Sequence, residues 1–105
     1  MRLTSFLQDG QLTIALSGEI DHHTAKMHIK TIIGKIEAYM PNICILDFQD
    51  VSFMDSSGIA VVINSLRQMR RMSGRLILVG LRKQPMKVLL ASGVDRIVEI
   101  KEMKT

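Results

Sequence analysis

The periodicity of apolar residues changes along the chain, and this change constrains the fold more than any other feature of the sequence. Apolar and polar residues alternate over residues 11–17, a period of two that predicts a half-buried strand. Apolar residues recur every three or four positions over 24–40 and again over 59–69, which predicts two amphipathic helices. A chain that switches between these two periods predicts an α/β domain.

The flanking segments continue the same alternation. Residues 3–8 and 11–17 lie on either side of Asp9-Gly10, so we expect them to pair as a hairpin. Short apolar runs predict further strands at residues 43–48, 75–80 and 97–100. A third helix is expected from Pro85 to Gly93. We therefore predict a mixed sheet of four to five strands packed against helices, with helical crossovers between the later strands and a polar, frayed end at 101–105.

The length and composition of the chain fit one domain. A chain of 105 residues can bury a single core, and 47% apolar residues is an ordinary share for a folded protein. We therefore treat residues 1–105 as one domain. No stretch approaches about eighteen consecutive apolar residues, and the N-terminus lacks the apolar region of a signal peptide. A cytoplasmic location without membrane contact is expected.

Metal and thiol chemistry find little support. Cys44 is the only cysteine and lies in an apolar run, so we interpret it as a small core residue in a reducing compartment. The nearest approach to a metal cluster is Asp21, His22, His23 and His28. Neighbouring histidines diverge, and metal-binding histidines on a helix are typically four residues apart, a spacing that these do not have. We expect no metal site and interpret Asp21 first as the cap of the following helix.

An enzymatic function would need machinery that the sequence does not show. There is no Gly-x-Ser-x-Gly elbow and no glycine-rich phosphate loop. If the fold brings a histidine near Ser56, the protein could instead be a small hydrolase. Turnover of acyl esters that is lost in Ser56→Ala would identify such an enzyme. We expect no enzyme activity and no cofactor, with nucleotide binding through another pocket left open.

The net charge of +4 raises a nucleic-acid-binding function as an alternative. Seven basic residues gather between the second and third predicted helices: Arg67, Arg70, Arg71, Arg75, Arg82, Lys83 and Lys87. Aromatic residues are only 4% of the chain, and no helix-turn-helix or zinc-finger spacing is present. We interpret these residues as a solvated face and expect no direct contact with nucleic acid. Affinity for DNA that falls steeply with salt would support the alternative.

The segment Asp55-Ser56-Ser57-Gly58 stands where a predicted strand passes into a helix. Serine and aspartate are common helix caps, so a structural role alone explains these residues. A serine at this position is also expected to be exposed. The first helical turn offers unpaired backbone N–H groups and a partial positive charge, so an added phosphate would be tolerated there. The same residues therefore fit either a cap or a phosphorylation switch.

Two segments resemble the paired signatures of the STAS-domain anti-sigma factor antagonists: Gly18-Glu19-Ile20-Asp21-His22-His23-Thr24-Ala25 and Phe53-Met54-Asp55-Ser56-Ser57-Gly58-Ile59. The likeness runs along nearly the whole chain and narrows to the sporulation branch, the anti-anti-sigma factors of spore-forming bacteria. It implies the STAS fold, which agrees with the predicted α/β domain. A general-stress antagonist of the same fold is the alternative, because both branches share the Asp-Ser-Ser-Gly element.

The resemblance implies a switch that works by exchange of partners. The unphosphorylated form would bind an anti-sigma factor, itself a serine kinase of the histidine-kinase-like ATPase fold, and so release the sporulation sigma factor. That kinase would phosphorylate Ser56, with Ser57 as the second choice, and a PP2C-type serine phosphatase would reverse the reaction. The family likeness and the expected exposure point to a partner-binding surface: Glu19, Asp21, His22, Asp55, Ser57 and Gly58.

Overall fold

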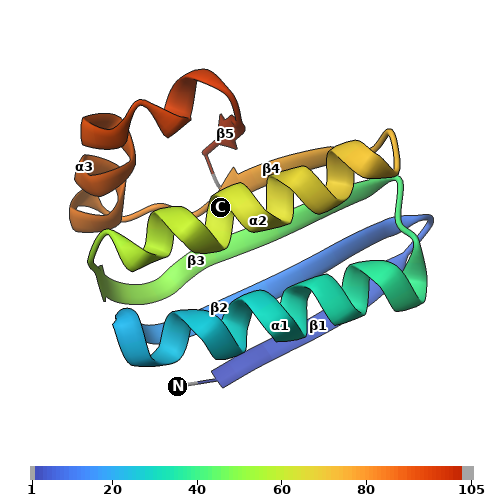
Figure 1. Ribbon diagram of the computed structural model, residues 1–105, viewed down its shortest axis with the longest axis horizontal. Coiled ribbons are helices and arrows are strands. Elements are labelled where there is room, and N and C mark those ends of the chain that lie inside the picture. The colour runs from blue at the N-terminus through green and yellow to red at the C-terminus, as the bar shows by residue number, and fades with distance from the viewer. Residues whose placement is uncertain (1, 103–105) are drawn as a thin grey trace.

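The computed structural model describes the backbone of residues 2–102 and the side chains of residues 3–102, and consists of a twisted sheet with helices packed against it (Figure 1). Its elements follow in the order β1 (Arg2–Gln8), β2 (Gln11–Ile20), α1 (His22–Tyr39), β3 (Ile43–Met54), α2 (Ser57–Arg71), β4 (Arg75–Val79), α3 (Lys83–Ser92), the 3₁₀ turn η1 (Val94–Arg96) and β5 (Glu99–Lys101). The predicted single α/β domain with a mixed sheet is confirmed.

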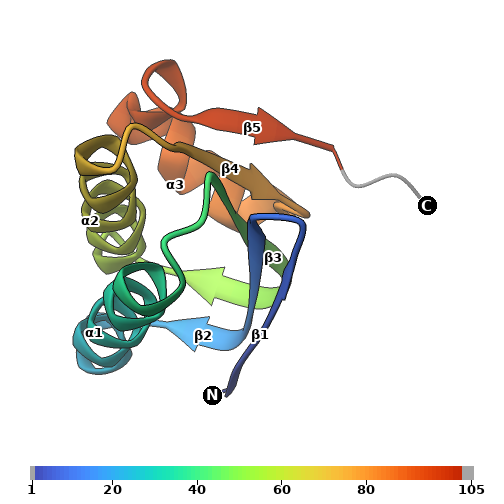
Figure 2. The same ribbon diagram turned by 90° about the vertical axis from the view of Figure 1, so that its right-hand side faces the viewer.

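The five strands lie side by side in the order in which they occur in the chain. β1 and β2 pair antiparallel as the predicted hairpin, across a turn in which both Asp9 and Gly10 have positive φ. The β2–β3, β3–β4 and β4–β5 pairs are parallel, so each needs a helical crossover. α1 and α2 lie together on one face of the sheet, and α3 lies near the end where α1 and α2 begin (Figures 1 and 2).

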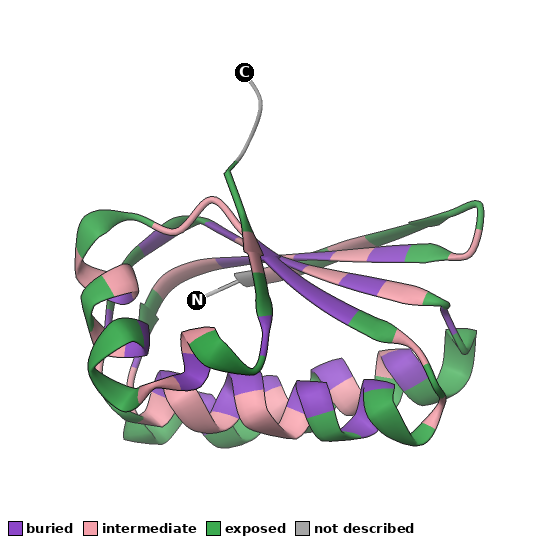
Figure 3. Cartoon of the chain, turned by 90° about the horizontal axis from the view of Figure 1, so that it is seen from above, coloured by how far each residue is buried: buried purple, intermediate pink, exposed green. Residues whose placement is uncertain are grey.

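The core lies between the sheet and the paired helices α1 and α2. The buried positions of both helices face the strands (Figure 3). β2 contributes every second residue to this layer, as its period of two predicts. Large side chains that are fully buried there include Leu12, Ile14, Ile32, Ile36, Leu46, Phe48, Met69 and Leu78. Burial of each such side chain is worth about 1.5–3 kcal/mol, so this layer is the main source of stability.

Several element boundaries differ from the predicted ones, among them the end of β3 and the start of β5. β3 does not end at Phe48 but continues to Met54, because residues 50–54 still pair with β2 through two register shifts. Polar residues interrupt the apolar run there and hid the extension. The last strand begins at Glu99 and not at Ile97, which is exposed beyond η1. Lys101 belongs to β5, and residues 103–105 of the expected frayed end lie outside the described part.

Cys44 lies in β3 and is fully buried. Burial raises the pKa of this thiol to about 12, because the thiolate would lose its hydration. The thiol is therefore protonated at neutral pH, and its interpretation as a core residue is confirmed.

Gly34 lies in the middle of α1, is exposed, and a Cβ built there would meet no atom within 4 Å. Glycine in a helix interior costs about 0.5–1 kcal/mol relative to alanine, because it loses more backbone freedom on folding. Gly34→Ala should therefore raise the free energy of unfolding by about this amount. Urea denaturation of both proteins measures the change, and an unchanged or lower midpoint would contradict it.

Candidate functional site

The two motif segments meet at one edge of the sheet. β2 and β3 are parallel, so their carboxyl ends lie together, with Glu19 opposite Phe53 and Ile20 opposite Met54. Just beyond the strands, the Asp55 N–H donates to the Ile20 carbonyl oxygen at 3.1 Å. α1 and α2 then begin from neighbouring points (Figure 1). Segments separated by about thirty residues in the sequence therefore form one continuous surface.

Ser56 is exposed at the N-cap position of α2, but its side chain does not form the capping hydrogen bond. Asp55 takes this role one residue earlier, since its Oδ1 accepts from the Ser57 N–H at 2.7 Å. This is the turn that aspartate forms with the backbone two residues on. A cap at this segment was rightly expected, but Asp55 provides it. The Ser56 hydroxyl is therefore not needed to hold the start of the helix.

The first amides of α2 are already paired, which corrects the expectation that they are free. The Gly58 N–H donates to the Asp55 carbonyl at 3.0 Å, and the Ile59 N–H donates to the Ser56 carbonyl at 3.1 Å. The Ser57 N–H is held by the Asp55 carboxylate. That carboxylate occupies the position where the helix end would attract an anion. A phosphate on Ser56 would instead extend into solvent beside a second negative charge.

Asp21 caps α1, as the sequence predicts. Its Oδ1 accepts from the N–H groups of His23 at 2.9 Å and Thr24 at 3.0 Å. The Thr24 hydroxyl accepts from the Asp21 N–H at 3.0 Å, which completes a reciprocal capping box. The hydrogen bond from the Thr24 N–H lowers the pKa of Asp21 below its usual value. The role of Asp21 at the start of α1 is thus established, and its contact with a partner stays a prediction.

The pKa of Asp21 makes the capping box sensitive to acid. Because the folded-state pKa is lowered, its contribution to stability is complete above the usual pKa of aspartate and is lost as the pH falls through the folded value. Asp21→Asn keeps a good cap without the charge. The variant should be less stable than wild type near pH 7, and the gap should narrow near pH 3, as urea midpoints would measure. A gap equally wide at both pH values, or also seen for exposed Glu37→Gln on α1, would contradict this.

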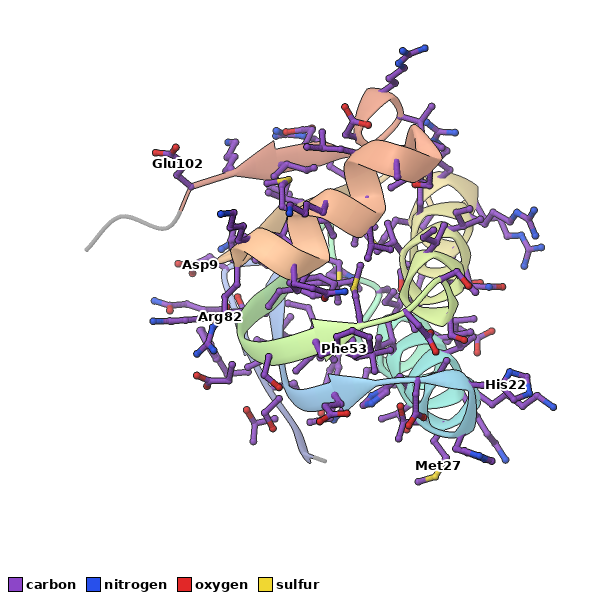
Figure 4. All side chains as sticks on the ribbon, turned by 90° about the vertical axis from the view of Figure 1, so that its left-hand side faces the viewer. Asp9, His22, Met27, Phe53, Arg82 and Glu102 are labelled. Atoms are coloured by element: carbon purple, nitrogen blue, oxygen red, sulfur yellow. The ribbon has the colours of Figure 1, made fainter. Side chains whose placement is uncertain are left out.

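The exposed side chains around Ser56 differ in chemistry. Glu19 is acidic, His22 and His23 carry imidazole rings, and Phe53 is 43% exposed. Figure 4 looks onto this end and shows Phe53 at the end of β3 and His22 pointing outward from the start of α1. Phe53 was not assigned to the partner surface from the sequence. Strand alternation was the available signal, because a buried Met54 turns its neighbour outward.

Gly58 and Ser57 lie deeper than expected for contact residues. Ser57 is half-buried in the first turn of α2, and Gly58 is buried. A Cβ at Gly58 would lie 2.6 Å from Sδ of Met54, so the helix packs directly on that side chain. The structure therefore explains Gly58 by packing inside the domain. A contribution of either residue to partner binding stays a prediction.

The basic residues do not form a single patch. Arg70, Arg71 and Arg75 lie near the end of α2 and the start of β4, whereas Arg82 lies at the opposite end, before α3 (Figure 1). Arg75 forms an ion pair with Glu99 at 2.7 Å. These residues therefore do not share the one solvated face that the sequence suggested, and they form no continuous stripe for a phosphate backbone.

The histidines are also separated. His22 and His23 are exposed with ring centroids 6.1 Å apart, whereas His28 is buried on α1. Burial lowers the pKa of His28, because the charged form would lose hydration. Within residues 2–102, no three His, Cys, Asp or Glu side chains are grouped as metal ligands. In the same range, none of the helices is both long and apolar enough for a membrane span.

The sequence of this chain matches the STAS domain family over residues 7–104, and the chain belongs to that family. It is 32% identical over 83 residues to the anti-sigma F factor antagonist of Lysinibacillus sphaericus, covering 79% of this chain and 71% of that protein. It is 28% identical over 93 residues to the anti-sigma-B factor antagonist of Listeria monocytogenes, covering 89% and 81%. The family inferred from the two motifs is confirmed, and its relatives include both anti-sigma F and anti-sigma-B factor antagonists.

The fold is also similar to that of the Bacillus cell fate determinant SpoIIAA in its phosphorylated form. The two share 27% identity and superpose with a TM-score of 0.76, which covers 98% of this chain and 92% of the other. The expected likeness to stage II sporulation protein AA, SpoIIAA, is thus confirmed at the level of fold and moderate sequence identity.

Proposed function

We propose that this protein is an anti-sigma factor antagonist that is switched off by phosphorylation of Ser56. In its unphosphorylated form it binds a cytoplasmic anti-sigma factor that is also a serine kinase, and so releases the sporulation sigma factor. The names of its relatives and its membership of the STAS domain family support this function. The protein itself acts by binding, without catalysis, and a PP2C-type phosphatase restores the active form.

The observation that carries this proposal is the state of Ser56. Ser56 is exposed and belongs to the surface formed by both motif segments, and its hydroxyl does not cap α2, because Asp55 provides the capping hydrogen bond. A kinase can therefore reach the oxygen without unwinding α2. Ser57 is less suited, because it is half-buried inside the first helical turn.

Phosphorylation would change the surface more than the fold. It adds about −1.5 to −2 charges and three strong acceptor oxygens. Asp55 lies next to the new phosphate with its carboxylate already bound to the Ser57 N–H, so the first amides of α2 cannot neutralise the added charge without rearranging. A partner surface shaped for a neutral hydroxyl would have to strip water from this phosphate, and every ~1.4 kcal/mol lost lowers the affinity tenfold.

The proposal is tested by mixing the purified protein with its cognate anti-sigma factor and sigma factor. Released sigma factor and a new complex between the two regulators are expected by size-exclusion chromatography. If the anti-sigma factor stays on the sigma factor at saturating antagonist, the proposal is wrong. Relatives of 32% and 28% identity do not separate the sporulation branch from the general-stress branch. Parallel assays with a sporulation (F-type) and a general-stress (B-type) anti-sigma factor decide between the two branches.

A further inference from the structure

β3 extends well beyond its pairing with β4. The two strands pair only over Ile43–Asp47 and Arg75–Val79, after which the chain turns away at Gly80 with a positive φ of 71°. Residues 50–54 continue to pair with β2 on the other side. The edge of β3 that leads to Ser56 therefore has no neighbouring strand on the β4 side. Its backbone groups there need other hydrogen-bond partners.

Two side chains that follow β4 supply these partners. The Arg82 Nε donates to the Gln49 carbonyl at 2.8 Å. Gln84, in the first turn of α3, binds Met54 twice: its Oε1 accepts from the Met54 N–H at 2.9 Å, and its Nε2 donates to the Met54 carbonyl at 2.9 Å. A side-chain amide thus makes both hydrogen bonds that a neighbouring strand would have made. Only this orientation of the amide satisfies a backbone donor and acceptor together.

Met54 is the last residue of β3, and Asp55 and Ser56 form the turn that connects it to α2, here called the Ser56 turn. The Met54 side chain is fully buried and packs against Gly58 in α2, and the next residue, Asp55, is bonded to Ile20 of β2. The peptide of Met54 is therefore held by α3 from one side, while the turn after it is held by β2 from the other. α3 begins at the same end of the molecule as the site (Figure 1).

We infer that Gln84 is a positioning residue that fixes the Ser56 turn through the backbone of Met54, so that the geometry of the switch depends on the placement of α3. Gln84 does not need to touch the partner or the phosphate. Its part in phosphorylation rests on the proposed function, but its effect on the turn does not.

A first experiment uses Gln84→Glu, which makes the two hydrogen bonds depend on pH. Below its pKa, the introduced carboxyl has an O–H to donate to the Met54 carbonyl and a C=O to accept from the Met54 N–H. Once ionised it can only accept, and it then faces the Met54 carbonyl oxygen. The amide NMR signals of Met54, Asp55 and Ser56 should therefore show a titration step in addition to any that the wild-type curve contains. Lys87→Glu, at an exposed position of the same helix, is the control and should lack this step. If the variant carboxyl titrates and these three amides follow the wild-type curve, the inference is wrong.

A second experiment measures phosphorylation by the cognate kinase. Gln84→Met keeps the length of the side chain but removes both hydrogen bonds. Misplacement of a reacting group by about 1 Å can cost a factor of 100, so we expect kcat to fall roughly 10- to 100-fold with a smaller change in KM. Lys87→Met should behave as wild type. Equal rates for the two variants would overturn the inference.

The two experiments fail in different ways. If wild type is not phosphorylated at Ser56, the proposed function fails, and the NMR titration still decides the role of Gln84. If Gln84→Met does not fold, Gln84→Glu takes its place, and its phosphorylation is measured at pH values above and below the titration step of the introduced carboxyl. The rate should then be higher on the acidic side, relative to wild type at the same pH. A ratio independent of pH would contradict the inference.

Discussion

Ser56→Asp should weaken binding to the anti-sigma factor by roughly 10- to 100-fold while leaving the fold intact. The fold should survive because the Ser56 side chain does not cap α2, and because aspartate is favoured at this position. Binding should suffer because the new charge lies on the exposed surface beside Asp55 and keeps its water. Isothermal titration calorimetry with the cognate anti-sigma factor measures the loss.

Two control variants separate this effect from a general change in charge. Ser73→Asp adds the same charge at an exposed position in the turn that follows α2, where Ser73 has a positive φ of 57° that aspartate tolerates. It should bind as wild type, and so should Ser56→Ala. An equal loss for Ser73→Asp, or a rearranged α2 in the spectrum of Ser56→Asp, would contradict the expected local effect.

Gly58→Ala should lower the free energy of unfolding by about 1–3 kcal/mol, the usual cost of overpacking a tight core position. The new Cβ would lie 2.6 Å from Sδ, 3.1 Å from Cγ and 3.2 Å from Cβ of Met54. The sulfur alone can move, but the atoms nearer the backbone cannot withdraw without shifting β3. Urea denaturation measures the loss. Gly34→Ala is the matched control, because the same substitution in an exposed helix should have the opposite sign.

The contact with Met54 can be tested as the cause of this loss. A Met54→Ala background removes the Sδ and Cγ contacts and keeps only the Cβ contact at 3.2 Å, so adding Gly58→Ala should cost much less than it does in wild type. The two substitutions are then coupled in a double-mutant cycle. If Gly58→Ala costs the same in both backgrounds, packing against Met54 is not the reason for glycine at this position.

Local patterns were enough to predict most of the fold. The alternation in β2 and the three-to-four spacing in α1 and α2 each depend on one buried face, which a sequence displays directly. The extension of β3 to Met54 could not be seen this way. Its polar residues belong to the strand because they pair with β2, and they show no regular buried face in the sequence. Two register shifts also break the alternation.

The site was predicted less completely, because its details depend on contacts between distant residues. Ser56 is proposed from its motif, and its position before α2 follows from the change of period. The sequence did not show that Asp55 and not Ser56 provides the cap, since either residue type can form that bond. Gln84 carries no signal at all, because its partner Met54 lies 30 residues away and is bound through backbone atoms.

Identification of the phosphorylated residue tests the central claim most directly. Wild type, Ser56→Ala and Ser57→Ala should each be incubated with the cognate anti-sigma kinase and ATP and then mapped by mass spectrometry. We predict one phosphate on Ser56 in wild type and in Ser57→Ala, and none in Ser56→Ala. Phosphate on another residue, or undiminished phosphorylation of Ser56→Ala, would contradict the assignment of Ser56 as the switch.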